Sequence, residues 1–329
     1  MSIVNEKDKH PYIDLGQDYK ISLNYADILD EKHLAMAKED LRETPEIREQ
    51  ALKELRELIE GEKNFVHATD DFFLLSYLRP CKFYAKSALE RMQTYYSFKL
   101  KYKKYIDNIT VESVRNIIED GIFKYSPLCD KNGRRIVFIQ CGKSWKLDRG
   151  NKYELFRCIQ IIFQAVALEP LTQIYGVSMV LDMGGLSMDQ VLTFTPSFAS
   201  MCLKWAHDCL PLRLKKIYIV NNSKIFNIFW ALFGPFMSAK LKERVHFINQ
   251  NYDVLAEYMG KECLGKEYDG SLPVEHADGK VFVEFLKLYE KQFELLNASG
   301  FVEENDDIGD RRNKVNTLAK EILRTIKVK

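Results

Sequence analysis

The chain has 329 residues, of which 46% are hydrophobic and 29% charged, and its formal net charge is +1. This length and apolar content allow a sizeable core, in one large or two modest domains. The near-neutral charge creates no global field, which argues against nucleic acid as a partner and leaves anion binding to local basic patches.

The seven cysteines are odd in number and unclustered, which favours free thiols in a reducing compartment. The first eleven residues contain no apolar stretch typical of a secretory signal. The longest charge-free apolar run covers residues 225–237, short of the roughly 20 residues that a spanning helix needs. We therefore expect a cytoplasmic, monomeric protein that associates with membranes only peripherally.

The first part of the chain predicts helices. Residues 1–40 show no clear hydrophobic period, and we expect a loosely attached N-terminal arm. Thr44 followed by Pro45 is typical of a helix N-cap with proline at the first helical position. Apolar residues at helical spacing then predict three helices, at residues 45–59, 71–78 and 82–103. These helices predict a small helical module over residues 41–108.

After the turn signal at residues 130–133, short apolar segments alternate with helical ones. Strands are expected at residues 136–139, 177–182, 216–220 and 245–248, and helices at residues 153–168, 188–207 and 225–236. Such alternation requires crossover connections and predicts an α/β domain, a largely parallel sheet covered by helices, over residues 109–280. Residues 281–329 are expected to form a helical extension with helices at 281–296 and 314–326.

Two glycine-containing segments resemble enzyme motifs but do not complete them. Residues 142–144 read Gly-Lys-Ser, yet Val137 stands where a phosphate-binding loop needs its first glycine. Residues 185–189 end in Asp189 where a nucleophile elbow needs glycine, and Ser187 is better explained as a helix N-cap.

A metal site is also unsupported. Cys202, His207 and Cys209 lie on or just after one expected helix, and no second Cys or His pair stands at zinc-like spacing. We therefore expect no catalytic residues, no metal and no cofactor other than a bound hydrophobic molecule.

Four motifs follow one another in the second half of the chain. They cover residues 176–187, 210–221, 235–246 and 263–270. In this order they resemble the CRAL-TRIO family of lipid-binding proteins, and residues 71–83 are similar to the helical module that precedes its lipid domain. Gly265 and Asp269 depart from the family's usual proline and glycine. The resemblance implies a mixed sheet that encloses an apolar lipid cavity, closed by a hinged lid helix.

The resemblance also implies which residues bind the ligand. On the helices and strands around the expected cavity these are Phe156, Ile159, Phe163, Val177, Met179, Leu181, Cys202, Trp205, Ala206, Leu212, Ile217 and Ile219. On the expected lid they are Ile225, Phe226, Phe229, Trp230 and Phe233. The alternative is ordinary core, because a parallel-sheet domain needs an apolar interior and an apolar helix is usually buried. Tocopherol carriers of the family have small hydroxyl side chains where Ile159 and Phe163 stand, so we expect a narrower and less polar pocket.

Basic residues flank the expected lid in the sequence. Arg213, Lys215, Lys240 and Arg244 match a phosphoinositide-headgroup site in the family, although a solvated face balanced by nearby acids is the alternative. We expect intracellular binding and inter-membrane transfer of a small hydrophobic lipid of the tocopherol, retinoid, carotenoid or sterol class, with phosphoinositide-dependent docking. Phosphatidylinositol exchange, and a phosphoinositide-anchored interaction module without a transported ligand, remain open.

Overall fold

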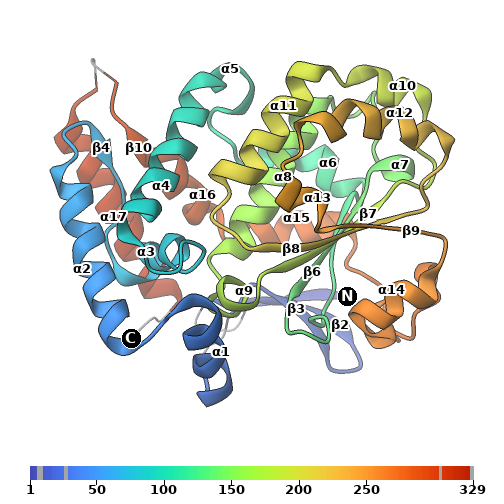
Figure 1. Cartoon of the computed structure of the whole chain (residues 1–329), viewed down its shortest axis with the longest axis horizontal. Coiled ribbons are helices and arrows are strands. Elements are labelled where there is room, and N and C mark those ends of the chain that lie inside the picture. Colours follow the sequence, from blue (N-terminus) through green and yellow to red (C-terminus); the bar gives the residue numbers. More distant parts are fainter. Residues whose placement is uncertain (6–9, 26–28, 304–305, 327–329) are drawn as a thin grey trace.

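The computed structural model describes residues 1–5, 10–25, 29–303 and 306–326. In Figure 1 the central sheet lies in the right half of the molecule, and helices of the N- and C-terminal regions, among them α2, α4 and α17, lie to its left. Residues 6–9 and 26–28 of the expected arm, and residues 327–329 of the expected extension, lie outside the described residues.

The central sheet has the strand order β5-β6-β7-β8-β9. Its strands are β5 (Phe123–Tyr125), β6 (Arg135–Gln140), β7 (Val177–Asp182), β8 (Leu214–Val220) and β9 (Val245–Asn249). β5 pairs antiparallel with β6, and the other neighbours are parallel. The expected α/β fold with a mixed, largely parallel sheet is confirmed.

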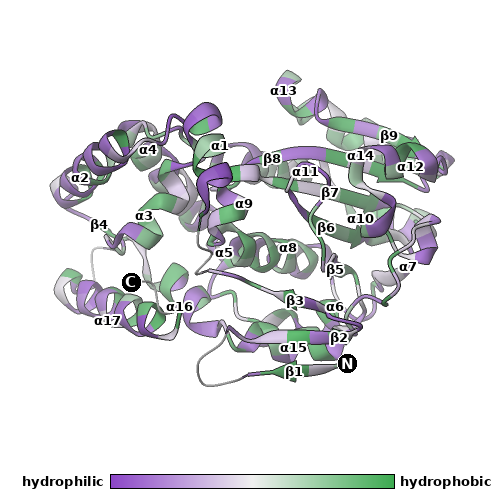
Figure 2. Cartoon of the chain, turned by 90° about the horizontal axis from the view of Figure 1, so that it is seen from below, coloured by the Kyte–Doolittle hydropathy of each residue, from purple (hydrophilic) through white to green (hydrophobic). Residues whose placement is uncertain are grey.

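Side chains alternate between the two faces of this sheet, as the pleat requires. On β6, Val137 and Ile139 belong to the main core, whereas Ile136 and Phe138 belong to a separate, smaller cluster. The main-core face is covered by α8 (Lys152–Ala167), α10 (Met188–Thr193), α11 (Pro196–Lys204) and α12 (Lys224–Phe233). The smaller cluster lies beneath α14 (Tyr252–Met259). In Figure 2, α8 is hydrophobic over most of its length, while α2 and α17 are mixed.

The helix expected at 188–207 is three elements. Ser187 caps α10 in a capping box with Gln190, which confirms its N-cap role. α10 ends at Thr193, because Pro196 cannot continue a helix and instead begins α11. α11 runs into a π-helical turn, η2 (Trp205–Cys209).

The helical module contains α2 (Pro45–Gly61), α3 (Asp71–Leu78) and α4 (Ala85–Lys101). Thr44 caps α2 by accepting a hydrogen bond from the Ile47 amide, as expected. α4 begins three residues later than expected, because Lys82 and Phe83 adopt left-handed backbone angles (φ 52° and 59°) that interrupt a helix.

The N-terminal arm differs from our expectation of a loose attachment. It forms an antiparallel sheet of β1 (Ser2–Val4), β2 (Tyr12–Gly16) and β3 (Tyr19–Ser22), followed by α1 (Glu31–Leu41). Ile13, Ile21 and Tyr25 are buried in the main core. Strands of three to five residues are too short to show a convincing period in the sequence.

The C-terminal region packs on the helical module. The single helix expected at 281–296 is divided into two helices, α15 (Gly279–Lys287) and α16 (Glu290–Ala298). The last helix is α17 (Ile308–Ile326). Between α16 and α17, β10 (Gly300–Phe301) pairs antiparallel with β4 (Phe65–Val66).

The short helices are α5 (Lys103–Ile106), α6 (Arg115–Glu119), α7 (Cys141–Ser144), α9 (Pro170–Tyr175) and α13 (Ala239–Lys242). The 3-10 turns are η1 (Glu112–Val114), η3 (Gly234–Phe236), η4 (Lys261–Cys263) and η5 (Lys266–Tyr268).

Candidate functional site

An apolar cavity of about 190 Å³ lies between the central sheet and the helices α8, α11 and α12. Its lining consists of aliphatic and aromatic side chains, methionines and the thiols of Cys141 and Cys202. Burial raises the pKa of both thiols, so they are protonated at neutral pH. The cavity therefore presents an almost entirely nonpolar surface.

Most of the residues that the sequence suggested for ligand binding line this cavity. They are Phe156, Ile159, Phe163, Met179, Leu181, Cys202, Trp205, Ala206, Ile217, Ile219, Phe229, Trp230 and Phe233. Other lining residues were not anticipated, among them Trp145, Leu155, Met183, Phe194, Phe198 and Met237. Phe194 and Phe198 flank the break at Pro196, within the region expected to form one continuous helix.

Four of the expected ligand-binding residues lie outside the cavity lining. Val177 is fully buried at the start of β7. Leu212 lines a basic groove instead. Ile225 and Phe226 belong to the first turn of α12, where Phe226 packs on Phe247 of β9, with ring centroids 6.1 Å apart.

α12 has one face toward the cavity and one toward solvent. Phe229 and Phe233 stack with centroids 4.3 Å apart on the cavity side. Ile228, on the other side, is 47% exposed, and Leu192 of the neighbouring α10 is 70% exposed. A core helix would be buried all round, so α12 is a covering helix with an apolar outer surface.

The four expected phosphoinositide-binding residues converge on one groove of about 400 Å³, hereafter the basic groove. Its lining is Asp40, Pro80, Lys82, Arg91, Ala206, His207, Leu212, Arg213, Leu214, Lys215, Lys240, Leu241 and Arg244. Ala206, Leu214 and Leu241 also line the apolar cavity, so the groove and the cavity share a wall.

The positive charges in the basic groove are crowded. Partial burial, together with the nearby Arg213, lowers the pKa of Lys215, and the same two causes lower that of Arg244. Arg244 donates to the Leu214 carbonyl at 2.6 Å, which holds it against β8. Cations that repel one another in this way favour the binding of an anion.

Comparison with known proteins matches residues 119–270 to the CRAL/TRIO domain. This part of the chain is a CRAL/TRIO domain. Members of this family bind and transfer lipids and are not enzymes.

Proteins similar to this chain include "Alpha-tocopherol transfer protein-like" of Homo sapiens, which is 27% identical over 248 residues, 75% of this chain and 72% of the relative. Clavesin-1 of Mus musculus is 24% identical over 241 residues, 72% of this chain and 68% of the relative. The crystal structure of Sfh5 aligns with a TM-score of 0.37 and 10% identity, covering 80% of this chain and all of that one. This structural likeness is too weak to support an argument.

A polar network in the CRAL/TRIO domain joins the end of β7 to the segment that leads into α12. Asp182, at the end of β7, accepts hydrogen bonds from Tyr268 (3.0 Å) and from Asn221 (2.9 Å). Tyr268 in turn accepts from Gln140 at 3.1 Å, and Tyr252 donates to Asn221. Burial and the charge of Asp182 raise the pKa of Tyr268, which keeps its hydroxyl a donor. The network fixes the strand ends and the segment that leads into α12.

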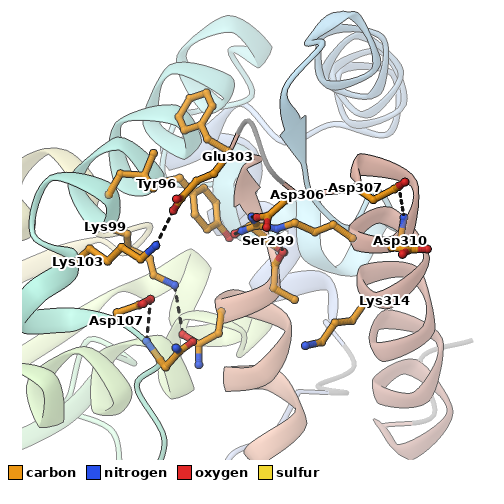
Figure 3. A pocket seen from close by; sticks show the side chains of 16 residues that line it. Tyr96, Lys99, Lys103, Asp107, Ser299, Glu303, Asp306, Asp307, Asp310 and Lys314 are labelled. Atoms are coloured by element: carbon orange, nitrogen blue, oxygen red, sulfur yellow. Dashed lines mark hydrogen bonds and ion pairs between the residues drawn. The ribbon is translucent and has the colours of Figure 1, made fainter.

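A second hollow, of about 450 Å³, lies outside the CRAL/TRIO match, between α4 and α17 (Figure 3). Some of its charged groups have partners within the hollow: Lys103 pairs with Glu303 at 2.6 Å, and Lys99 donates to Asn297 Oδ1 at 3.2 Å. We therefore do not regard this hollow as a ligand site. Within the described residues no group of three or more His, Cys, Asp or Glu side chains is placed to hold a metal ion.

Proposed function

We propose that the protein binds one small hydrophobic lipid in the apolar cavity and transfers it between membranes. The observation that carries the proposal is the nonpolar lining, to which helices on one side and strands on the other contribute. Burying apolar surface contributes roughly 25 cal/mol per Å², so such a cavity favours a lipid over water. The related protein named as transfer protein-like supports the same function.

The size of the cavity implies movement on binding. Ligand sites typically enclose about 300–1,000 Å³, and this cavity measures about 190 Å³. We propose that α12 acts as a lid and shifts outward to admit the lipid. Exposing Phe229, Trp230 and Phe233 to water would cost about 1.5–3 kcal/mol for each side chain. The lid therefore stays closed in water and opens where a bilayer covers these rings.

Docking to the membrane is proposed to use two neighbouring surfaces. The outer side of the lid region exposes Ile228, Leu192, Phe236 and Phe247. The basic groove supplies Arg213, Lys215, Lys240 and Arg244 for a phosphoinositide headgroup. Each basic side chain near an anionic bilayer contributes about 1 kcal/mol, which gives reversible attachment. None of the described helices is long and apolar enough to span a bilayer.

The cavity favours a lipid with few polar groups. Ile159 and Phe163 make the wall hydrophobic where a hydroxyl could otherwise hold a polar ligand group. A phosphatidylinositol headgroup would need charged or polar partners inside the cavity, and the polar atoms of its lining side chains are only thiols, thioethers and the indole N–H groups of three tryptophans. We therefore propose the tocopherol, retinoid, carotenoid or sterol class rather than phosphatidylinositol exchange.

We also propose how the rest of the chain contributes to this function. Residues 41–108 form the helical module, residues 109–280 the lipid-binding domain, and residues 281–329 an extension. The protein is proposed to act as a cytoplasmic monomer that attaches to membranes peripherally.

Extraction of the purified protein, followed by mass spectrometry, tests the carrier function. We expect one hydrophobic lipid per chain, or saturation near one equivalent on titration with a fluorescent tocopherol, retinoid or sterol. Protein that carries no lipid and binds none of these probes would contradict the proposal.

The docking surface is tested with a double variant, Lys240→Glu with Arg244→Glu, on phosphatidylcholine vesicles that contain phosphatidylinositol 4,5-bisphosphate. We expect loss of preference for these vesicles and slower transfer, with ligand affinity in solution unchanged. Lys242→Glu is the matched control, because it lies on the same helix, is exposed and does not line the basic groove. Normal transfer by the double variant would refute phosphoinositide docking.

A further inference from the structure

One carboxylate lies among the cations of the basic groove. Asp40, near the end of α1, accepts a hydrogen bond from Arg213 Nη2, and its Oδ2 lies 3.2 Å from Lys215 Nζ. No other acidic side chain lines the described groove. Asp40 lies outside the CRAL/TRIO match, so an element beyond that domain supplies the negative charge.

Asp40 is ionised in this position. Partial burial would raise the pKa of its carboxyl, but the hydrogen bonds and charges of Arg213 and Lys215 outweigh that effect and hold the pKa below its ordinary value. At neutral pH the carboxylate thus satisfies two of the cations that a headgroup phosphate would contact.

The cations at the other end of the groove have no carboxylate partner among the described residues. In the described part of the chain no ion pair joins a carboxylate to Lys82, Arg91, Lys240 or Arg244, and the two arginines donate to backbone carbonyls instead. One end of the groove, at Arg213 and Lys215, is therefore occupied by the Asp40 carboxylate. The other end, around Lys240 and Arg244, is open to a ligand and is called the open end below.

We propose that Asp40 is a specificity-determining residue of the groove, competing with headgroup phosphate for Arg213 and Lys215. A headgroup with one ring phosphate binds at the open end alone. A headgroup with two ring phosphates carries enough charge to displace the carboxylate and uses both ends. Asp40 thereby restricts docking to membranes rich in polyphosphorylated inositol lipids. This inference rests on the proposed docking function.

The contact of Asp40 with Arg213 and Lys215 can be removed without detaching α1 from the core. Ala37 and Leu41 anchor the helix in the core, and His33 Nδ1 lies 2.9 Å from the Tyr175 hydroxyl. Asp40→Asn keeps the shape of the side chain and removes its charge. Glu39→Gln is the matched control, because it removes the same charge from the neighbouring position, which is exposed and outside the groove.

The experiment measures the binding of the full chain to phosphatidylcholine vesicles that contain either phosphatidylinositol 4-phosphate or phosphatidylinositol 4,5-bisphosphate. The wild type should prefer the bisphosphate. Asp40→Asn should raise affinity for the monophosphate vesicles roughly three- to tenfold, as expected for removal of a partly exposed charge-assisted contact. Asp40→Asn should also reduce the preference for bisphosphate over monophosphate vesicles. Glu39→Gln should change neither the affinity for monophosphate vesicles nor this preference. Soluble inositol 1,4,5-trisphosphate should compete in each case, which separates headgroup recognition from general attraction to a charged bilayer.

Unchanged or weaker binding by Asp40→Asn, with unfolding midpoints equal to those of the wild type, would overturn the inference. Weaker binding would mean that Asp40 positions the cations instead of competing for them. If the Lys240→Glu, Arg244→Glu variant loses docking while Asp40→Asn has no effect, only the inference fails. If neither variant alters docking, the proposed docking surface fails as well.

Discussion

Replacing Phe163 by alanine tests whether the apolar cavity is a ligand-binding site or a packing defect in an ordinary hydrophobic core. Phe163 is buried on α8, lines the cavity and packs edge-on against Trp205, with centroids 6.2 Å apart. A fully packed phenylalanine costs about 3–5 kcal/mol on truncation to alanine. Because a ring surface that faces a void has no partner atoms to lose, we expect roughly 2 kcal/mol at Phe163.

Phe285→Ala is the matched comparison. Phe285 is fully buried on α15, between Phe282 and Tyr289, and does not line the cavity. It should lose the full 3–5 kcal/mol by urea unfolding and leave ligand preference unchanged. Phe163→Ala should lose less stability and shift preference toward bulkier lipids in competition titrations. Equal losses for the two variants, with identical ligand preference, would refute the assignment of Phe163 to a ligand site.

Three further outcomes follow from burial and charge. Ile228→Asp, on the exposed side of α12, should lower vesicle binding and transfer while changing the free energy of unfolding by less than about 0.5 kcal/mol. Leu34→Asp on α1, equally exposed at 47%, is the control and should change neither vesicle binding nor transfer. If both variants bind vesicles alike, α12 does not contact the membrane. Burial lowers the pKa of His67 to about 4, so the unfolded chain takes up a proton first as the pH falls from 6.5. The free energy of unfolding of the wild type should therefore drop by up to about 3 kcal/mol between pH 6.5 and 4. His67→Phe should remove most of this drop, and an unaltered pH dependence in the variant would contradict the assignment of the drop to His67. Burial lowers the pKa of Lys99 to about 8, so the folded chain binds fewer protons than the unfolded chain above that pH. Wild-type stability should then rise from pH 8 toward 10.5, and Lys99→Met should abolish the rise in thermal unfolding scans.

The alternation of short apolar strands with helices was sufficient to predict the central sheet, because buried parallel strands such as β7 are continuous apolar runs. The cap at Thr44 and the helix that follows it were also readable, since capping depends only on neighbouring residues. The N-terminal sheet was missed. Its strands are stabilised by contacts of Ile13 and Tyr25 with a core built from distant segments, and no local pattern records such contacts.

The candidate site was predictable to a similar extent. The motifs that resemble the family pointed to Phe156 on α8 and to Met179 and Ile217 on the sheet, and all three line the cavity. They could not show which end of a strand or helix the cavity reaches, and for this reason Val177 and Phe226 fall outside it. The position of Asp40 in the basic groove depends on how α1 docks against α9, which the sequence alone does not reveal.

The pairing of β10 with β4 joins residues 300–301 to residues 65–66 and so ties the C-terminal helices to the helical module. Residues of both regions, and of the CRAL/TRIO domain, share one continuous core. Segments that bury surface against each other in this way unfold as a cooperative unit, because none is stable once its neighbour leaves. A fragment that ends before residue 300 would expose Phe65, which packs on Phe301 of β10, and Tyr96, which packs on Phe65 and against Gly300. The protein should therefore melt in a single transition, and protease resistance of the N-terminal helices should depend on the last thirty or so residues of the chain.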